Sequence, residues 1–568
     1  MPTVYVNDKP VEIGNRKINC IQAAELAGVF IPSYCWHEAL SVVASCRMCL
    51  VEVGDLKDGK IAMQPKVVPG CQTPVKDGTV IVTGEYDKRD PQVSALPYDP
   101  GYVKGGKPGE RAKNSQADTL EGLLLNHPLD CPVCDKAGEC KLQDFSYKYG
   151  RSESRMVDVK NTPKNKPQLS SKITLFTDRC IMCTRCVRFT REISGTAELM
   201  VAGRGHHEEI DVFPGRPLEN KLAGNVVDLC PVGALGSKDF LYKQRVWYLK
   251  STNGVCSGCS TGCSIHVDTN KEIVYRLRPR FNPESQGHFM CDEGRYGYHF
   301  ANSSARISRP IIRVDGAEKP AMWSTVTPRL KQLISDAVRK NAKGVAAVFS
   351  PFLTVEEAFL LCTYFKGLSP DVRLTLGPVP RDGEDDKYPK DVKGNAIEPV
   401  KFTIRAEKCP NRRGVEAVLK HFQGSVIAST AIGTEGIEAM WFAGGYPDRK
   451  VVETAFAGWK APAQLIAQDL FQSTVTAAAS IVLPATSSFE KDGTFVNHAG
   501  LAQTFTRSVR PPQEARTELQ LAFDLLGRKG LVQAASIRAE LAKAIPFFAG
   551  LAEKNLPANG VRFELAMA

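Results

Sequence analysis

Cysteine is the residue type with the clearest chemical potential in this chain of 568 residues. Fifteen of its 18 cysteines fall, together with one histidine, into four groups with ligand-like spacings. Thiolates and imidazoles spaced in this way bind zinc or iron–sulfur clusters, and a chain without a secretion signal does not favour a disulfide framework. The sequence therefore predicts four metal centres. We name them the first set (Cys35, Cys46, Cys49, Cys71), the second set (His127, Cys131, Cys134, Cys140), the third set (Cys180, Cys183, Cys186, Cys230) and the fourth set (Cys256, Cys259, Cys263, Cys291).

The first set has the pattern Cys-x10-Cys-x2-Cys-x21-Cys, which is close in style to [2Fe–2S] ferredoxins, where a loop wraps the cluster and a distant thiolate closes it. A zinc site would favour two Cys-x2-Cys knuckles, and only one is present here. The flanking sequence predicts two hairpins and a helix, the arrangement of a β-grasp fold. We expect strands at 3–6, 11–13, 50–53 and 79–82 and a helix at 21–27, with Cys20 a buried and inert thiol.

The second set is compact, because one histidine and three cysteines lie within fourteen residues. The Gly-, Pro- and Lys-rich stretch 98–116 reads as a linker or surface loop. A helix capped by Asp118 or Thr119 should then end at Pro128, so that His127 lies on its last turn. An imidazole in place of a thiolate makes a cluster less negative and raises its potential.

The third set has the pattern of bacterial [4Fe–4S] ferredoxins, with three close cysteines and a remote Cys-Pro. It follows a polar connection at 151–172. The fourth set combines Cys-x2-Cys-x3-Cys with the remote Cys291 and is also expected to hold a [4Fe–4S] cluster. Zinc remains the alternative for these sets, and would make the protein a zinc-stabilised scaffold.

The second half of the chain alternates between helical patterns and short apolar strands, which predicts an α/β domain with a parallel sheet. We expect an exposed loop at 382–395. Cys362 lies in an apolar helical stretch and Cys409 in a charged loop without a partner motif. The expected helices are 325–342 and 354–367, and the expected strands are 345–349, 437–443 and 481–483.

Charge and composition exclude several classes of function. The formal charge of +11 counts every cysteine as neutral, and four clusters with thiolate ligands would lower it to roughly +4. Basic residues do not alternate with aromatic ones along any stretch, which argues against nucleic-acid binding. Apolar runs are too short for a transmembrane helix, and the N-terminus opens as a strand without a leader, so we expect cytoplasmic residence in a bacterium. Without a G-x-G-x-x-G fingerprint, nicotinamide and flavin binding are expected on other chains.

Several segments together resemble the large iron–sulfur subunit of bacterial respiratory complex I, the NADH:quinone oxidoreductase (75 kDa type). The resemblance covers residues 1 to about 310 in order. It implies a [2Fe–2S] cluster on the first set and [4Fe–4S] clusters on the other three, with electrons passing from the first set to the third and then to the second. The fourth set would lie off this path. The segments are IPSYCWHEALSVVASCRMCLVEV, HPLDCPVCDKAGECKLQD, DRCIMCTRCVRF, DLCPVGAL, VCSGCSTGCSIHV and MCDEGRYGYHF.

The C-terminal half resembles the degenerate molybdopterin-oxidoreductase domain of the same family. MWFAGGYPDR and IVLPATSSFEKDGTFVNHAG carry this likeness, and Gly493, Thr494, Phe495 and Asn497 match its recurrent block. Neither Cys362 nor Cys409 looks like a molybdenum ligand, so we expect no molybdopterin and a scaffold role. The expected fold is multidomain α+β and α/β: 1–84 a β-grasp [2Fe–2S] domain, 85–150 the segment of the second set, 151–248 a [4Fe–4S] ferredoxin-like domain, 249–305 a [4Fe–4S] domain of the molybdenum or tungsten oxidoreductase type, and 306–568 a shortened molybdopterin-oxidoreductase-like α/β domain.

The resemblance implies a peripheral-arm electron-transfer subunit of a proton-pumping enzyme, without catalytic residues or a substrate site of its own. Its partners would be the flavin- and NADH-binding subunit, the quinone-proximal iron–sulfur subunit and other peripheral-arm subunits. It would reach the cytoplasmic face of the inner membrane through them. A subunit of a formate dehydrogenase or of an NAD-reducing hydrogenase is the alternative, because both share the N-terminal array of clusters.

Overall fold

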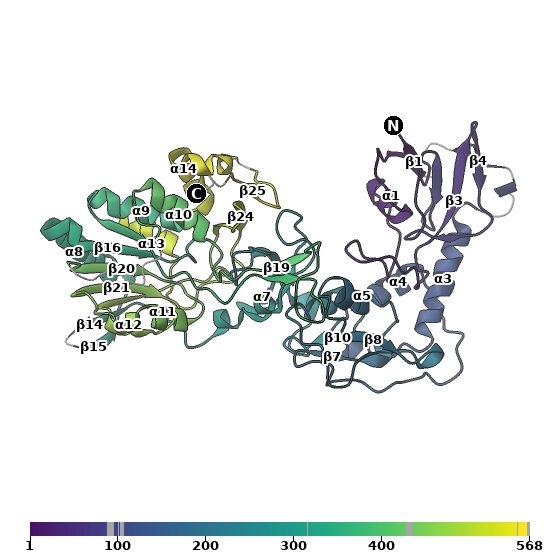
Figure 1. The fold of residues 1–568 in the computed structure, drawn as a ribbon, viewed down its shortest axis with the longest axis horizontal. Coiled ribbons are helices and arrows are strands. Elements are labelled where there is room, and N and C mark those ends of the chain that lie inside the picture. The colour runs from purple at the N-terminus through teal and green to yellow at the C-terminus, as the bar shows by residue number, and fades with distance from the viewer. Residues whose placement is uncertain are drawn as a thin grey trace. The chain divides into compact units, whose positions relative to one another are not determined.

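The computed structural model divides the chain into two compact units, which are described separately (Figure 1). The first unit contains Met1–Trp247 and Pro389–Ile397, and the second contains Tyr248–Tyr388 and Glu398–Ala568. Part of the predicted linker, residues 100 and 103–106, lies outside the described residues. The structure describes residues 1–87, 96–99, 101–102, 107–314, 316–427, 436–553 and 555–564.

The first unit begins with the predicted β-grasp sheet, whose strand order is β2-β1-β6-β3-β4 with β5 paired to β3. A tight turn joins β1 to β2 antiparallel, and its residues Asn7 and Asp8 have φ of 48° and 66°, as a two-residue hairpin turn requires. β1 then pairs in parallel with the distant β6, which closes the fold. The strands are β1 (Thr3–Val6), β2 (Lys9–Glu12), β3 (Leu50–Lys57), β4 (Lys60–Met63), β5 (Val68–Pro69) and β6 (Thr79–Val82).

Helix α1 (Cys20–Leu26) packs on this sheet, as predicted. Asn19 and Gln22 form a capping box at its start, and Gly28 follows its end with φ +70°. Cys20 is fully buried in the same core, and burial raises the pKa of its thiol to about 12. The predicted burial of this thiol is confirmed, and its inertness stays a prediction.

Helix α3 (Glu110–Leu124) begins earlier than predicted, at Glu110 and not at Asp118 or Thr119. The carboxylate of Glu52 on β3 accepts hydrogen bonds from the backbone N–H groups of Arg111 and Ala112, at 3.2 and 3.3 Å. It thereby satisfies backbone N–H groups of the first turn, for which no residue nearby in the sequence provides a cap. The helix also ends before His127, so the expectation that this histidine lies on its last turn was wrong.

The rest of the first unit is built from short elements around the second and third sets. β7 pairs antiparallel with β10, which brings the two ends of the ferredoxin-like segment together. β8 and β9 form a second short hairpin. The elements are α4 (Lys141–Tyr149), β7 (Ile173–Leu175), α5 (Arg185–Glu192), β8 (Leu199–Ala202), β9 (Glu209–Val212), α6 (Asn225–Leu229) and β10 (Leu235–Ser237).

The second unit opens with a small antiparallel sheet that carries the fourth set. Its strands β11 (Lys250–Val255), β12 (Ser264–Asn270) and β13 (Ile273–Pro279) pair in chain order. Helix α7 (Asp292–Tyr296) follows, with Cys291 as its N-cap. A second small sheet pairs β23 (Gly493–Val496), β24 (Leu501–Phe505) and β25 (Val561–Arg562), and the recurrent block Gly493, Thr494, Phe495 lies on its first strand.

The predicted parallel sheet is the centre of the second unit, with helices on both faces (Figure 1). The strand order is β15-β14-β22-β21-β20-β16-β17, parallel from β22 to β17. Along β20, Trp441 packs toward α9 and α13, whereas Phe442 packs toward α11. The strands are β14 (Ile311–Val314), β15 (Ala317–Pro320), β16 (Val345–Phe349), β17 (Arg373–Leu376), β20 (Ala439–Ala443), β21 (Gln464–Asp469) and β22 (Ile481–Pro484). The helices are α8 (Trp323–Asn341), α9 (Val355–Leu368), α10 (Arg412–His421), α11 (Arg449–Ala455), α12 (Thr474–Ala478), α13 (Glu518–Leu525) and α14 (Ala534–Ala544).

The stretch 382–395, expected as an exposed loop, is partly ordered into a strand. β18 (Asp386–Tyr388) pairs with β19 (Phe402–Ile404), and Tyr388 is buried. A strand of only three residues, Asp-Lys-Tyr, leaves too weak a periodic signal to detect. Within the described part of the chain, no helix combines the length and apolar composition needed to cross a bilayer.

Candidate metal centres

The structure brings the four cysteines of the first set together in the loops beside β3. All four are buried. Hydrogen bonds from Cys46 and Cys71 hold the pKa of the Cys35 thiol well below its usual range, and a hydrogen bond from Cys71 lowers the pKa of Cys49. The backbone N–H of Cys35 also donates to the sulfur of Cys46 at 3.4 Å. Four thiols converge here, although Cys71 is distant in sequence.

The third set is enclosed. All four of its cysteines line a cavity of about 20 Å³, whose wall is completed by apolar side chains such as Ile181 and Val232. Burial, and then the neighbouring Cys230, raise the pKa of Cys180 to about 12 and that of Cys183 to about 11. Thiols in such a place stay protonated unless a positive centre binds them.

In both of these sites, residues other than glycine adopt the left-handed backbone conformation. Arg47 in the first set and Met182 and Thr184 in the third have φ of 58°, 49° and 57°. Such conformations are unfavourable for residues with a Cβ, and they concentrate where function requires them. Successive N–H groups are turned toward one concave side in this geometry, which suits an anionic ligand. The spacing of the cysteines gave no sign of this feature.

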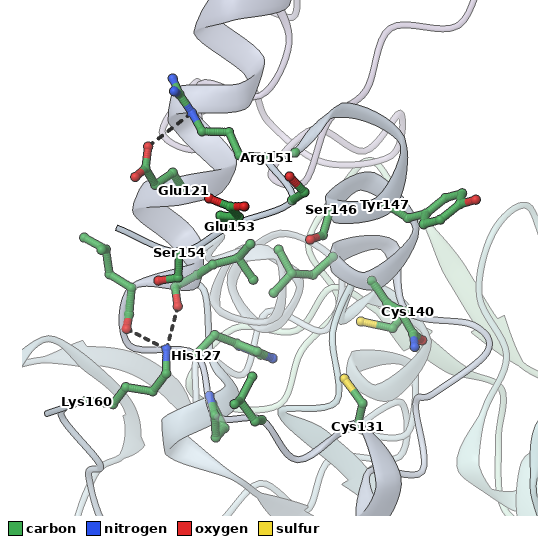
Figure 2. A pocket seen from close by; sticks show the side chains of 18 residues that line it. Glu121, His127, Cys131, Cys140, Ser146, Tyr147, Arg151, Glu153, Ser154 and Lys160 are labelled. Atoms are coloured by element: carbon green, nitrogen blue, oxygen red, sulfur yellow. Dashed lines mark hydrogen bonds and ion pairs between the residues drawn. The ribbon is translucent and has the colours of Figure 1, made fainter. Parts of the chain in front are cut away.

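The second set is open to solvent on one side. His127, Cys131 and Cys140 line a pocket of about 750 Å³, and Figure 2 shows the imidazole pointing toward the two thiols. Cys131 is exposed, whereas Cys134 and Cys140 are buried. Most of the remaining wall is apolar, with Leu129 at 88% exposure beside it.

His127 has the properties of a metal ligand. Its buried Nδ1 has no hydrogen-bond partner among the described residues. Burial, and then the charges of Lys160 and Arg179, lower its pKa to about 4. The imidazole is therefore neutral at physiological pH, with a lone pair available for a metal.

The fourth set is buried within the second unit and is cradled by two glycines. The N–H groups of Gly258 and Gly294 donate to the sulfurs of Cys256 and Cys291 at 3.4 and 3.3 Å. A Cβ on Gly294 would lie 2.8 Å from the sulfur of Cys256, so a larger residue there would fill the site. Burial raises the pKa of Cys256 to about 12. Gly258 and Gly294 are functional positions that the sequence reasoning missed.

The first and third sets are joined through helix α5, which contains Cys186. Arg188 donates to the carbonyl oxygens of Cys35 and Cys183, at 2.5 and 3.2 Å. Arg185 donates to the carbonyl oxygens of Trp36 and Leu229, and so also joins the loops of both sets.

The third and second sets meet at the turn that follows Cys230. The backbone N–H of Lys141, next to Cys140, donates to the carbonyl oxygen of Pro231 at 3.0 Å. A Cβ on Gly233 would lie only 2.2 Å from the sulfur of Cys134. The contacts thus link the sets in the order first, third, second, which differs from their order in the sequence.

The donors fit iron–sulfur clusters. Arg185 and Arg188 are 4% and 8% exposed, and no carboxylate among the described residues forms an ion pair with either. Buried cations without partners are costly, and a cluster with four thiolates supplies the missing negative charge. In the described ranges, no group of three or more His, Cys, Asp or Glu side chains is arranged to hold a single metal ion.

Family models match most of the chain in consecutive blocks. The descriptions are 2Fe-2S iron-sulfur cluster binding domain (2–86), NADH-ubiquinone oxidoreductase-G iron-sulfur binding region (116–155), NADH-quinone oxidoreductase subunit 3 ferredoxin-like domain (170–236), molybdopterin oxidoreductase Fe4S4 domain (249–303) and molybdopterin oxidoreductase (392–528).

Relatives with related names align with about three fifths of the chain. The NADH-ubiquinone oxidoreductase 75 kDa subunit of Reclinomonas americana is 33% identical over 63% of this chain and 47% of its own length. The mitochondrial NADH dehydrogenase [ubiquinone] iron-sulfur protein 1 of Solanum tuberosum is 35% identical over 61% of this chain and 42% of its own. The chain is homologous to the 75 kDa-type subunit of complex I. It spans about half the length of the curated relatives it matches.

A solved chain of an NAD⁺-reducing [NiFe]-hydrogenase is 24% identical, with a TM-score of 0.34, over 43% of this chain and 90% of that one. The family-model matches show 2Fe–2S and 4Fe–4S binding domains followed by a molybdopterin-oxidoreductase domain in this chain, in a mixed α/β structure.

Two cysteines of this homologue of the 75 kDa-type subunit lie in its molybdopterin-oxidoreductase half. Cys362 is fully buried in the core of α9, as expected for a helix-core residue. Cys409 lies in the expected charged loop, near Glu407 and Arg412, and it is fully buried. Burial raises the pKa of both thiols.

Proposed function

We propose that this chain relays electrons in a proton-pumping NADH:quinone oxidoreductase, from a flavin subunit toward quinone. The observation that carries the proposal is the unbroken series of contacts from the first set through α5 to the third set, and through Pro231 and Gly233 to the second. A relay needs redox centres that neighbour one another, and this series of contacts supports an arrangement of the three candidate centres in a row.

The ligand assignments follow the four sets. The first set would hold one [2Fe–2S] cluster, and the second, third and fourth sets would each hold one [4Fe–4S] cluster, with His127 as the one imidazole ligand. When bound, each cluster supplies one-electron chemistry. The protein's own residues position the thiols, exclude water from the third and fourth sets, and provide positive charge beside the first and third.

We assign a supporting role to the C-terminal half. Cys362 is fully buried among apolar residues of the core, which supports our proposal that no molybdopterin is bound. The fourth set would be a side site, away from the path through the other three. We retain 1–84, 85–150, 151–248, 249–305 and 306–568 as the proposed domain limits.

The partners would be the flavin- and NADH-binding subunit, the quinone-proximal iron–sulfur subunit and other peripheral-arm subunits. We place the chain at the cytoplasmic face of a bacterial inner membrane, held there by these partners. The apolar, solvent-open pocket beside the second set supports a covering subunit at the exit of the path.

Metal and sulfide analysis of the anaerobically purified assembly tests the proposal. We expect about fourteen irons and an equal number of sulfides attributable to this chain if all sites are filled. Four additional paramagnetic species should appear on reduction. Zinc in place of iron would overturn the relay, a nickel subunit in the assembly would favour a hydrogenase, and molybdenum near one per chain would contradict the scaffold role.

The variant His127→Cys tests the histidine ligand. A thiolate makes the cluster more negative, so one [4Fe–4S] signal should move to lower potential while the others stay in place. The matched control is His207→Cys, which adds a thiol at an exposed position. Movement of several signals, or of none, would contradict the assignment.

A further inference from the structure

One face of helix α5 carries polar side chains that bind the loop of the first set. Arg185, Arg188 and Glu192 are separated by three and four residues, so they lie on one side of the helix. Glu192 accepts hydrogen bonds from the backbone N–H of Ser41, at 2.8 Å, and from its hydroxyl. Arg188 also donates to the carbonyl oxygen of Ser41.

The same helix belongs to the third set. Cys186 lies on α5 and Cys183 lies just before it. Arg188 bonds the carbonyl oxygen of Cys183 at 3.2 Å, and Arg185 bonds that of Leu229, next to Cys230, at 3.3 Å. Each guanidinium therefore holds a carbonyl from the loop of the first set and a carbonyl from the third.

No carboxylate among the described residues forms an ion pair with these arginines, although Glu192 lies one turn from Arg188 on the same face of α5. Both side chains are nearly inaccessible to solvent, and their bonded partners are carbonyls and the hydroxyl of Thr184. Cysteines of both sets, Cys183, Cys35 and Cys230, favour the charged form of Arg185, whereas burial and the charge of Arg188 oppose it. A fork of several N–H donors on one fixed charge is also what sets arginine apart from lysine.

We propose that Arg188, with Arg185, is a positioning residue for electron transfer that clamps the first and third sets together and raises the reduction potential of both clusters at once. The inference rests on the proposed function, because its counter-charge is the pair of clusters. A positive charge shared by two anionic centres stabilises the reduced form of each, since reduction adds negative charge. Because the same charge acts on both clusters, it raises both reduction potentials together and leaves the difference between them unchanged.

The variant Arg188→Met in the assembled, anaerobically purified protein tests the charge. In an EPR-monitored redox titration, the signals of both sets should become about tenfold harder to reduce, which is about 59 mV for one electron. The signal of the third set is identified by its loss in Cys186→Ser. The matched control is Arg191→Met, an exposed arginine on the same helix, which should shift either equilibrium by less than about twofold.

The variant Arg188→Lys tests the clamp separately. The charge is kept, so both potentials should stay within about threefold of the wild type, but one ammonium group cannot bond carbonyls of both loops as the fork does. Hydrogen exchange in residues 35–46 should therefore speed up about tenfold. Unchanged exchange would overturn the clamp.

The outcomes separate the inference from the proposed function. If the wild type shows both iron–sulfur signals and Arg188→Met leaves their potentials unchanged, shifts only one, or matches Arg191→Met, the inference is overturned and the relay stands. If the wild type has no such signals, both are overturned. Should Arg188→Met fail to fold, Arg185→Met, which also joins the two loops, is judged on the same readings.

Discussion

Buried positive charges are compensated in different ways in the two units. In the second unit, Arg306 forms a two-point ion pair with Glu490, and Lys491 lies 2.9 Å from Glu357 and 3.4 Å from Glu518. In the described part of the first unit, the hydrogen-bond partners of Arg185 and Arg188 are neutral oxygens. The second unit thus satisfies these charges with its own carboxylates. In the first unit the buried Arg179 likewise pairs with Asp130, at 2.8 Å, whereas Arg185 and Arg188 depend on something that binds to the unit. The stability of the region around α5 should therefore depend on bound clusters, whereas that of the second unit should depend on its buried carboxylates.

Removal of the third cluster should have the largest effect and should be confined to the first unit. In Cys183→Ser, the two guanidinium groups lose a counter-charge, and an uncompensated buried charge costs about 3–5 kcal/mol. Hydrogen exchange resolved by segment should show α5 and residues 35–46 losing protection while β16, β20 and β21 keep theirs. Equal loss in both units would show that the division by charge is wrong.

Removal of a buried cation from the second unit should give a comparable loss that does not depend on iron. Lys491→Met leaves Glu357 and Glu518 buried without their ammonium partner, which should lower the free energy of unfolding by about 3–5 kcal/mol. Denaturant unfolding of the second unit measures it. Lys340→Met removes a lysine from an exposed pair with Glu438 and should cost less than about 1 kcal/mol. If both variants cost the same, the carboxylate network does not stabilise the second unit.

The third and second sets are joined by a close approach at Gly233, without the buried arginines that join the first and third sets at α5. Gly233→Ala places a Cβ against the sulfur of Cys134, and relief of this overlap should cost about 1–3 kcal/mol. The EPR signal of the second set should broaden or weaken while that of the first is retained. Gly236→Ala, where the nearest atom is a leucine methyl group 3.2 Å away, is the control. A change confined to the first set would contradict the contact order.

The carboxylate network of the second unit should also make stability depend on pH. Burial raises the pKa of Glu357 to about 8, well above its value in an unfolded chain. A raised pKa means that the folded state holds a proton more tightly, so this contribution is complete below about pH 4.5 and is lost as the pH rises through about 8. Glu357→Gln should flatten the fall in stability between about pH 5 and pH 9. An unchanged slope would show that another group titrates.

The sequence predicts elements best where their signals are local. Helix α9 has its capping box in Thr354 and Glu357 and its apolar run beside them, and it was predicted almost to the residue. Helix α3 was not, because its first-turn donors are satisfied by Glu52 of a distant strand. His127 was expected on a helix because Pro128 looked like its end, yet α3 stops at Leu124, where Lys160 binds its last carbonyls.

The candidate sites were also predictable only where the signal is local in the sequence. Spacing alone grouped the four sets, and the structure brings the thiols of the first, third and fourth sets together. It could not show which sets touch, because contact order depends on side chains such as Arg188 and on the close approach at Gly233. Nor could the spacing show that Arg47 and Met182 adopt a left-handed conformation, because arginine and methionine rarely do so.

The exposure of Cys131 has a practical consequence for anyone who isolates this protein. A thiolate that solvent reaches is the first to meet peroxide or dissolved oxygen, and sulfinic acid cannot return to a ligand. Damage should therefore begin at the second set while the enclosed third set survives. If the second set holds a cluster as proposed, brief exposure to air would leave a preparation that retains most of its iron and colour but has lost that cluster.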